Sequence, residues 1–232
     1  MEILNLGSHR IGVRFPEKGL RKGKNPAILL NDGKLIEQLD LRTERAVLVG
    51  VYPNNRLSEY TPWPEPAIRP GTPDFGGQLG QYHRELNNEI LTALIDEYAL
   101  DTEKLAYGGY SLGGLAATMS LWETDAFAAV FSLCGSFWYP GVADFIEEHV
   151  PKNYSAQVYL QNGIREGKGH NNRLCDAYSY AQRVHTALQA TCGAKTVLDD
   201  YGHHDRQSER LNAALRWVER VLLIIGVNFG VC

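Results

Sequence analysis

The stretch KLAYGGYSLGGLAATM, residues 104–119, joins a short apolar run to a run of small residues through Gly109-Tyr110-Ser111-Leu112-Gly113. An apolar run that passes through glycines into small residues with helical spacing indicates a strand, a tight turn and a helix. Gly-x-Ser-x-Gly in that context is typical of a nucleophile elbow, where small neighbours allow a serine to occupy a strained turn. The same residues also suit a serine that only caps a helix, so the rest of the chain must distinguish the two.

Strands and helices alternate along the chain on both sides of this stretch. Strands are predicted at 9–16, 26–33, 45–53, 103–110, 127–137, 156–163 and 194–202, and helices at 34–44, 78–100, 111–123, 173–193 and 208–225. The strands are continuous apolar runs, which is typical of parallel sheets buried on both faces. The sequence therefore predicts one doubly wound α/β domain over 1–232, with a mostly parallel sheet and helices on both faces.

Composition narrows the class of protein. The net charge is −4 with 44% hydrophobic residues, which argues against a nucleic-acid-binding protein. The apolar segment 221–232 is shorter than a membrane span of about 20 residues, so we expect the buried end of a last helix and a short apolar tail.

Two further features bear on location. The first ten residues lack the apolar core of a secretory signal. Four cysteines, Cys134, Cys175, Cys192 and Cys232, have no close spacing and are expected to be free thiols. Both features favour a reducing compartment, and we expect a cytoplasmic location.

A nucleophilic serine needs a base to take its proton and an acid to orient that base. The loop after the strand at 156–163 offers Glu166, and the loop after the final predicted strand offers His203 and His204. Carboxyl ends of parallel strands share one sheet edge, so these side chains are expected near Ser111. We favour His203 over His204 as the base because it directly follows a glycine that lets the chain turn.

The acid has competitors. Asp199 and Asp200 lie at the end of the strand that leads to the histidine, and Asp176 lies within a predicted helix. Glu166 is in the loop where an orienting acid is expected, and it is the preferred candidate. Its alternative interpretation is a surface carboxylate that pairs with a neighbouring cation.

An oxyanion that forms during attack needs hydrogen-bond donors. The N–H of Leu112, next to the serine at the start of a helix, is the first candidate. The second is expected from the turn after the strand at 26–33, where Gly33 and Lys34 are the candidates. An ordinary strand-to-helix turn would contain the same residues.

A proline-rich stretch at 53–77 holds five prolines between Pro62 and Pro73, and we interpret it as an active-site loop. Its Arg56, together with Trp138 and Tyr110 at the same sheet edge, is a candidate for substrate binding. Packing of the loop alone would explain the aromatic residues equally well.

No metal or cofactor site is predicted. His83, His170 and His185 lack the spacing of metal ligands, and we expect all three on the surface.

Three segments resemble a known family: YGGYSLGGLAATMSLWETDAFAAVFSLCGSFWYPG (107–141), NGIREGKGHNNR (162–173) and YGHHDRQSERLNAALRWV (201–218). They are similar to the putative-esterase branch of the α/β-hydrolases, which includes siderophore esterases, S-formylglutathione hydrolases, feruloyl esterases and mycolyltransferases. The resemblance implies an α/β-hydrolase fold with Ser111 as nucleophile, Glu166 as acid and His203 as base. Members often carry Gly-Gly-His before the base, whereas this chain has Tyr201 in place of the first glycine.

These observations predict a serine hydrolase that cleaves a small carboxylic ester through an acyl-enzyme, without cofactor, nucleic-acid or membrane partner. Two alternatives stay open. An acyltransferase would use the same three residues with an alcohol acceptor, and a non-catalytic binding module could reuse the scaffold.

Overall fold

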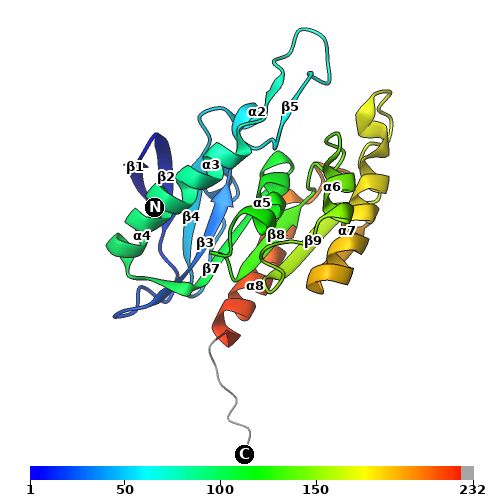
Figure 1. Ribbon diagram of the computed structural model, residues 1–232. Coiled ribbons are helices and arrows are strands. Elements are labelled where there is room, and N and C mark those ends of the chain that lie inside the picture. The colour runs from blue at the N-terminus through cyan, green and yellow to red at the C-terminus, as the bar shows by residue number, and fades with distance from the viewer. Residues whose placement is uncertain (226–232) are drawn as a thin grey trace, which may run out of the picture.

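The computed structural model describes residues 1–225, and its centre is an eight-stranded sheet in the order β1-β2-β4-β3-β7-β8-β9-β10 (Figure 1). The strands are β1 (Glu2–Leu6), β2 (His9–Arg14), β3 (Asn25–Asn31), β4 (Val47–Tyr52), β7 (Leu100–Tyr110), β8 (Ala129–Leu133), β9 (Gln157–Gly163) and β10 (Lys195–Asp199). β1 and β2 form an antiparallel hairpin, and β2 pairs antiparallel with β4. All other neighbours in this sheet are parallel, as predicted.

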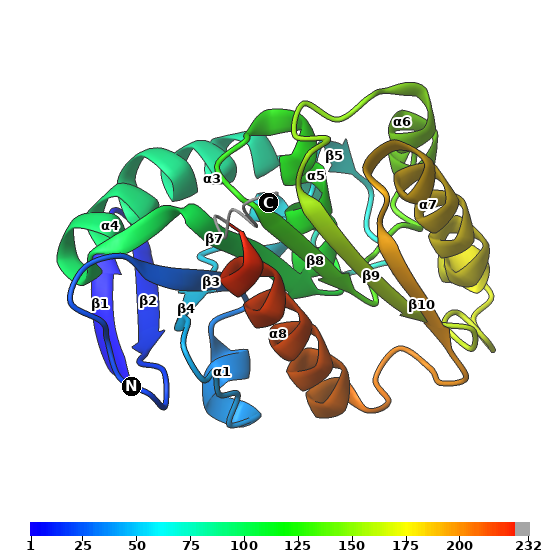
Figure 2. The same cartoon turned by 90° about the horizontal axis from the view of Figure 1, so that it is seen from below.

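Helices cover both faces of the sheet, and Figure 2 shows α1 and α8 together on one of them. The helical segments are α1 (Lys34–Gln38), α2 (Arg56–Glu59), α3 (Leu79–Glu85), a π-helical turn (Leu86–Ile90), α4 (Leu91–Tyr98), α5 (Leu112–Glu123), α6 (Val142–Glu148), a 3₁₀ turn (Arg173–Asp176), α7 (Ala177–Cys192) and α8 (Gln207–Ile224). Within 53–77, β5 (Pro64–Glu65) and β6 (Phe75–Gly76) pair as a separate small antiparallel sheet.

Parallel strands in the middle of the sheet are buried on both faces because alternate side chains enter different layers of helices. In β3, Leu29 joins the apolar cluster under α3, α4 and α5, whereas Ile28 and Leu30 join the cluster under α1 and α8. All three are fully buried, which accounts for the continuous apolar runs in the sequence.

The differences from the predicted elements have local causes. The edge strand β1 was not predicted, because its residues are largely exposed and its pairing depends on β2. Helix α6 was also missed. The helix predicted over 78–100 contains the π-helical turn, which shifts its buried face by part of a turn.

The last helix ends at Ile224, and the apolar tail expected after it lies outside the described residues. Within 1–225, no helix combines the length and apolar character that a membrane crossing requires.

The parallel arrangement brings three chain segments to one edge of the sheet. β7 ends at Tyr110, β9 ends at Gly163 and β10 ends at Asp199, and the three strands point the same way. The loops that follow them carry the residues of the candidate site.

Candidate active site

Ser111 lies on the sharp turn between β7 and α5, with φ 60° and ψ −122°. A residue with a side chain adopts such a conformation at a cost of about 1–3 kcal/mol, which the surroundings must hold in place. Its N–H donates to the carbonyl of Leu133 on β8 at 2.9 Å. A Cβ at Gly109 would lie 2.4 Å from the Gly113 carbonyl, so the tight passage of strand past helix requires glycine there.

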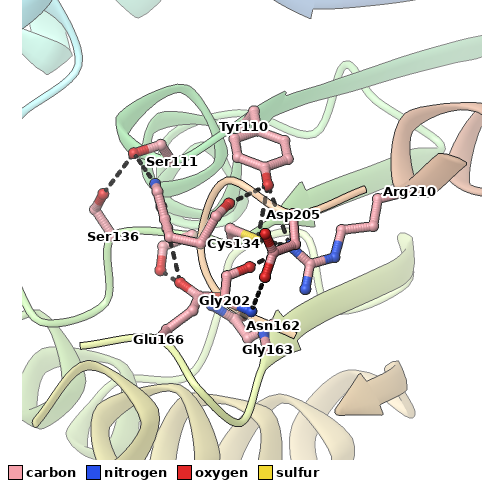
Figure 3. Close-up of polar contacts among 12 residues, drawn as sticks. Tyr110, Ser111, Cys134, Ser136, Asn162, Gly163, Glu166, Gly202, Asp205 and Arg210 are labelled. Carbon is pink, nitrogen blue, oxygen red and sulfur yellow. Dashed lines mark hydrogen bonds and ion pairs between the residues drawn. The ribbon is translucent and has the colours of Figure 1, made fainter. Parts of the chain in front are cut away.

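Three side chains from separate loops form a continuous chain of hydrogen bonds. His203 Nε2 lies 3.1 Å from Ser111 Oγ, and His203 Nδ1 lies 2.8 Å from Glu166 Oε2. The Ser136 hydroxyl, 3.3 Å from Ser111 Oγ, is a further contact of Ser111 (Figure 3). His204 is exposed, and its ring packs edge-on against His203 at 4.8 Å between centroids.

The Glu166 side chain is buried, with its other oxygen also engaged. Oε1 accepts the N–H of Gly163 at 2.7 Å and lies 3.3 Å from Nδ2 of Asn162. Burial opposes ionisation, but the hydrogen bond and charge of His203 and the N–H of Gly163 outweigh it, so the pKa of Glu166 lies below its ordinary value. Glu166 is therefore a carboxylate that can hold His203 with its proton on Nδ1.

Arg210 supports the loop that carries His203. It is 2% exposed, and its guanidinium forms an ion pair with Asp199 at the end of β10. The same group donates to the carbonyl of Gly202 at 3.0 Å and contacts the Tyr110 hydroxyl at 3.2 Å. Burial alone would lower the pKa of Arg210, but Asp199 raises it above its ordinary value, so the cation is retained beneath the histidine loop.

Tyr110 does not contribute to the cavity wall as the sequence suggested. Its side chain is buried, and its hydroxyl donates to the backbone carbonyl of His203. Arg56 is also placed differently from expectation. Its guanidinium forms a two-pronged ion pair with Asp32 at 2.8–3.0 Å and lies 3.3 Å from the Tyr110 carbonyl. Both residues brace the turns around Ser111.

The residues predicted to donate hydrogen bonds to an oxyanion differ in whether their N–H groups are available. Leu112 begins α5 beside Ser111, and its N–H has no acceptor among residues 1–225. The N–H of Gly33 instead donates to the carbonyl of Val51 at 2.9 Å, because the turn after β3 packs directly onto β4. Gly33 thus has no free donor to offer. Lys34 is exposed at the start of α1 and is not part of the cavity wall around Ser111.

A cavity of about 500 Å³ opens above Ser111 and His203. Its apolar wall is formed by Ile68, Trp138, Leu174 and Ala177. Its basic side chains are Arg69, Arg165, Lys168, His170 and His204, and its acidic side chains are Glu166 and Asp205. Trp138, a candidate for substrate binding from the sequence, forms part of this wall. The volume falls in the range of small-molecule sites.

The stretch 53–77 reaches this cavity through Ile68 and Arg69. It is fastened to loops that follow other strands. The Trp63 indole N–H donates to the carbonyl of Pro140 at 3.0 Å, and Arg173 donates to the carbonyl of Pro66 at 2.6 Å. Neither contact involves a strand of the main sheet.

Two of the three histidines expected on the surface are buried. His83 is 2% exposed and contacts Glu123 at 2.7 Å, and His185 is 3% exposed and contacts Asn162 at 3.0 Å. Each lies on the apolar stripe of its helix, four residues after Leu79 and Ala181 respectively. His170 is exposed, as expected.

A cluster of metal-ligand type coincides with the site. Cys134, Glu166 and His203 each have one ligand atom within 4.8 Å of the others. Burial raises the pKa of the Cys134 thiol, which therefore keeps its proton, and Arg210 Nη1 lies 2.9 Å from its sulfur. A cation there would meet a neutral thiol and a fixed guanidinium, so we assign the cluster to the Ser111 site.

The sheet, the turn at Ser111 and the later loops define an α/β-hydrolase fold. A family model described as putative esterase matches residues 7–217, and the chain belongs to that family. The uncharacterized protein YbbA of Bacillus subtilis (strain 168) is 28% identical over 204 residues, covering 80% of this chain and 82% of YbbA.

Solved structures resemble the fold at low sequence identity. The enterobactin esterase FES from Shigella flexneri matches with TM-score 0.72 and 16% identity over 96% of this chain and 58% of its own. The IroE-like serine hydrolase from Shewanella oneidensis matches with TM-score 0.68 and 17% identity over 93% of this chain and 75% of its own. At this identity the likeness concerns the fold.

Arg210→Met is expected to lower the free energy of unfolding by about 3 kcal/mol, because it leaves the partly buried Asp199 carboxylate without its cation. Urea unfolding followed by circular dichroism measures the change. The matched control is Arg216→Met on the exposed side of α8, which should stay within about 0.5 kcal/mol of the wild type. Equal stability of both variants would contradict the role assigned to Arg210.

The burial of His185 should make the free energy of unfolding depend on pH. Burial lowers its pKa to about 4, whereas an unfolded histidine titrates near about 6.5. The unfolded state therefore binds this proton first, and stability falls as pH decreases from about 6.5 to 4, by on the order of 2 kcal/mol. His185→Leu should flatten this part of the curve of unfolding free energy against pH. An unchanged slope in the variant would show that His185 is not buried as a neutral base.

Proposed function

We propose that this chain is a serine esterase in which Ser111 is the nucleophile, His203 the base and Glu166 the orienting acid. The observation that carries the proposal is the unbroken contact from Glu166 through His203 to Ser111, at 2.8 and 3.1 Å, with the serine held at positive φ. Membership of the putative esterase family supports the reaction type.

The mechanism follows from these positions. Ser111 Oγ attacks the ester carbonyl carbon while His203 Nε2 accepts its proton, and the Leu112 N–H donates to the developing oxyanion. Collapse of the tetrahedral intermediate breaks the ester C–O bond, and His203 returns the proton to the leaving alcohol. Water then repeats the sequence on the acyl-enzyme, which releases the acid and restores Ser111. Glu166 stays ionised throughout and stabilises the imidazolium.

The unpaired charges at the cavity bear on which esters the site would bind. Arg69 and Lys168 form no ion pair within the described residues, whereas Arg165 pairs with Asp200 at 2.7 Å. These unpaired cations lie at a cavity in a chain whose net charge is −4. We infer that the site favours esters that carry a negatively charged group beyond the reacting carbonyl.

Transfer of the acyl group to an alcohol would use the same residues, as would a binding module that has lost turnover. Hydrolysis is preferred because water needs no second binding site. Product analysis with and without added alcohols separates hydrolysis from transfer, and labelling of Ser111 by a fluorophosphonate probe separates an active serine from an inert scaffold.

Ser111→Ala is expected to lower turnover of p-nitrophenyl acetate by about 10³-fold or more and to abolish fluorophosphonate labelling, because no nucleophile remains. The variant should keep its fold, since the Oγ atom supports only the contacts with His203 and Ser136. Circular dichroism checks the fold. Turnover at the wild-type rate in the folded variant would overturn the proposed function.

Replacing both Arg69 and Lys168 by Glu is expected to raise KM for the monoanionic ester 4-nitrophenyl hydrogen succinate about tenfold. The neutral 4-nitrophenyl acetate should be affected little. Arg21→Glu combined with Lys22→Glu is a charge-matched control, because these two exposed residues form no ion pair within the described chain, precede β3 and lie at the opposite end of the strands. Equal changes in KM for the two esters would contradict the inferred preference.

A further inference from the structure

A buried histidine lies behind Glu166, the acid of the candidate site. His185 of α7 places Nε2 3.0 Å from Oδ1 of Asn162, which is near the end of β9. Nδ2 of Asn162 lies 3.3 Å from Oε1 of Glu166, whose other oxygen contacts His203. His185 and Asn162 are 3% and 1% exposed, and neither forms part of the cavity wall.

The hydrogen-bond partners of His185 determine which of its ring nitrogens carries the proton. His185 is neutral because burial lowers its pKa to about 4, although the charge of Glu166 acts in the opposite direction. Its Nδ1 is buried without a partner. A proton on Nδ1 would be a buried donor with no acceptor, so the single ring proton belongs on Nε2, where Asn162 Oδ1 accepts it.

The orientation of the Asn162 amide follows from that proton. With Oδ1 held by His185, the amide presents its NH₂ group to Glu166 and to the carbonyl of Gly135 at 3.4 Å. The flipped amide would turn a carbonyl oxygen toward a buried carboxylate and a second acceptor. Two facing acceptors in a buried site repel each other, and the carboxylate would lose a donor.

We propose that His185 is a positioning residue of the esterase, which acts by fixing the Asn162 amide so that its NH₂ group holds Glu166 toward His203. The proposal rests on the proposed function of Ser111, His203 and Glu166. The chain of hydrogen bonds then extends from α7 through β9 to the nucleophile, and His185 influences turnover without touching substrate.

A double-mutant cycle tests this dependence. His185→Leu is expected to lower kcat for p-nitrophenyl acetate about 10–100-fold with KM unchanged, because the buried Asn162 amide loses the partner that fixes its orientation. In the Asn162→Leu background the same substitution should have almost no further effect, because its influence passes through the amide. His185→Gln retains an N–H donor and should recover part of kcat. Full activity of folded His185→Leu, equal losses in both backgrounds, or equal losses in the Leu and Gln variants would each overturn the proposal.

An independent measurement separates this proposal from the proposed function. The ¹⁵N shifts of labelled histidine are expected to show His185 as the neutral Nε2–H form from pH 5 to 8, in protein with or without Ser111→Ala. Its Nδ1–H form, or protonation above pH 5, would refute the positioning role even in an active esterase. Absence of fluorophosphonate labelling in the wild type would refute the esterase, and the tautomer measurement would still decide the hydrogen-bond arrangement.

Discussion

The buried carboxylate of Glu166 is the group on which the geometry of the site depends. It must stay ionised in a place that disfavours charge, and it does so because both oxygens have donors: His203 on one side, and Gly163 and Asn162 on the other. A carboxylate fixed in this way determines which nitrogen of His203 carries the proton. The free lone pair at Nε2 then faces Ser111. The buried carboxylate of Glu166 thereby determines the protonation state of His203.

His203 is held from two directions. From the acid side it is bonded to Glu166, and from the backbone side the Tyr110 hydroxyl donates to its carbonyl. Arg210 joins these supports because it pairs with Asp199 and contacts both Gly202 and Tyr110. The histidine loop is exposed at its outer side but anchored beneath by a buried cation, which restricts the imidazole without burying it.

Much of this arrangement could be predicted from the pattern of residues in the sequence. Continuous apolar strands indicated a parallel sheet. The motif at Ser111 and the order of the later loops indicated Glu166 and the pair His203 and His204, of which the structure brings Glu166 and His203 to Ser111. The supporting residues were harder to predict because their roles depend on contacts between distant elements. His185 and Arg210 nevertheless left a signal, since each is a polar residue on the apolar stripe of its helix. Gly33 was a candidate donor, but its N–H is bonded to the carbonyl of Val51, and a contact between two separate segments of this kind cannot be read from the sequence.

The stretch 53–77 contributes no strand to the main sheet, yet it forms part of the cavity wall and is fastened by side-chain to backbone bonds at Pro66 and Pro140. Tyr60 and Phe75 of this stretch belong to the buried apolar cluster, whereas no residue from 66 to 74 is buried. In evolutionary terms, residues 66–74 form a segment that descendants can exchange to alter which molecules they accept, while the core contacts at its two ends and the residues around Ser111 are inherited unchanged.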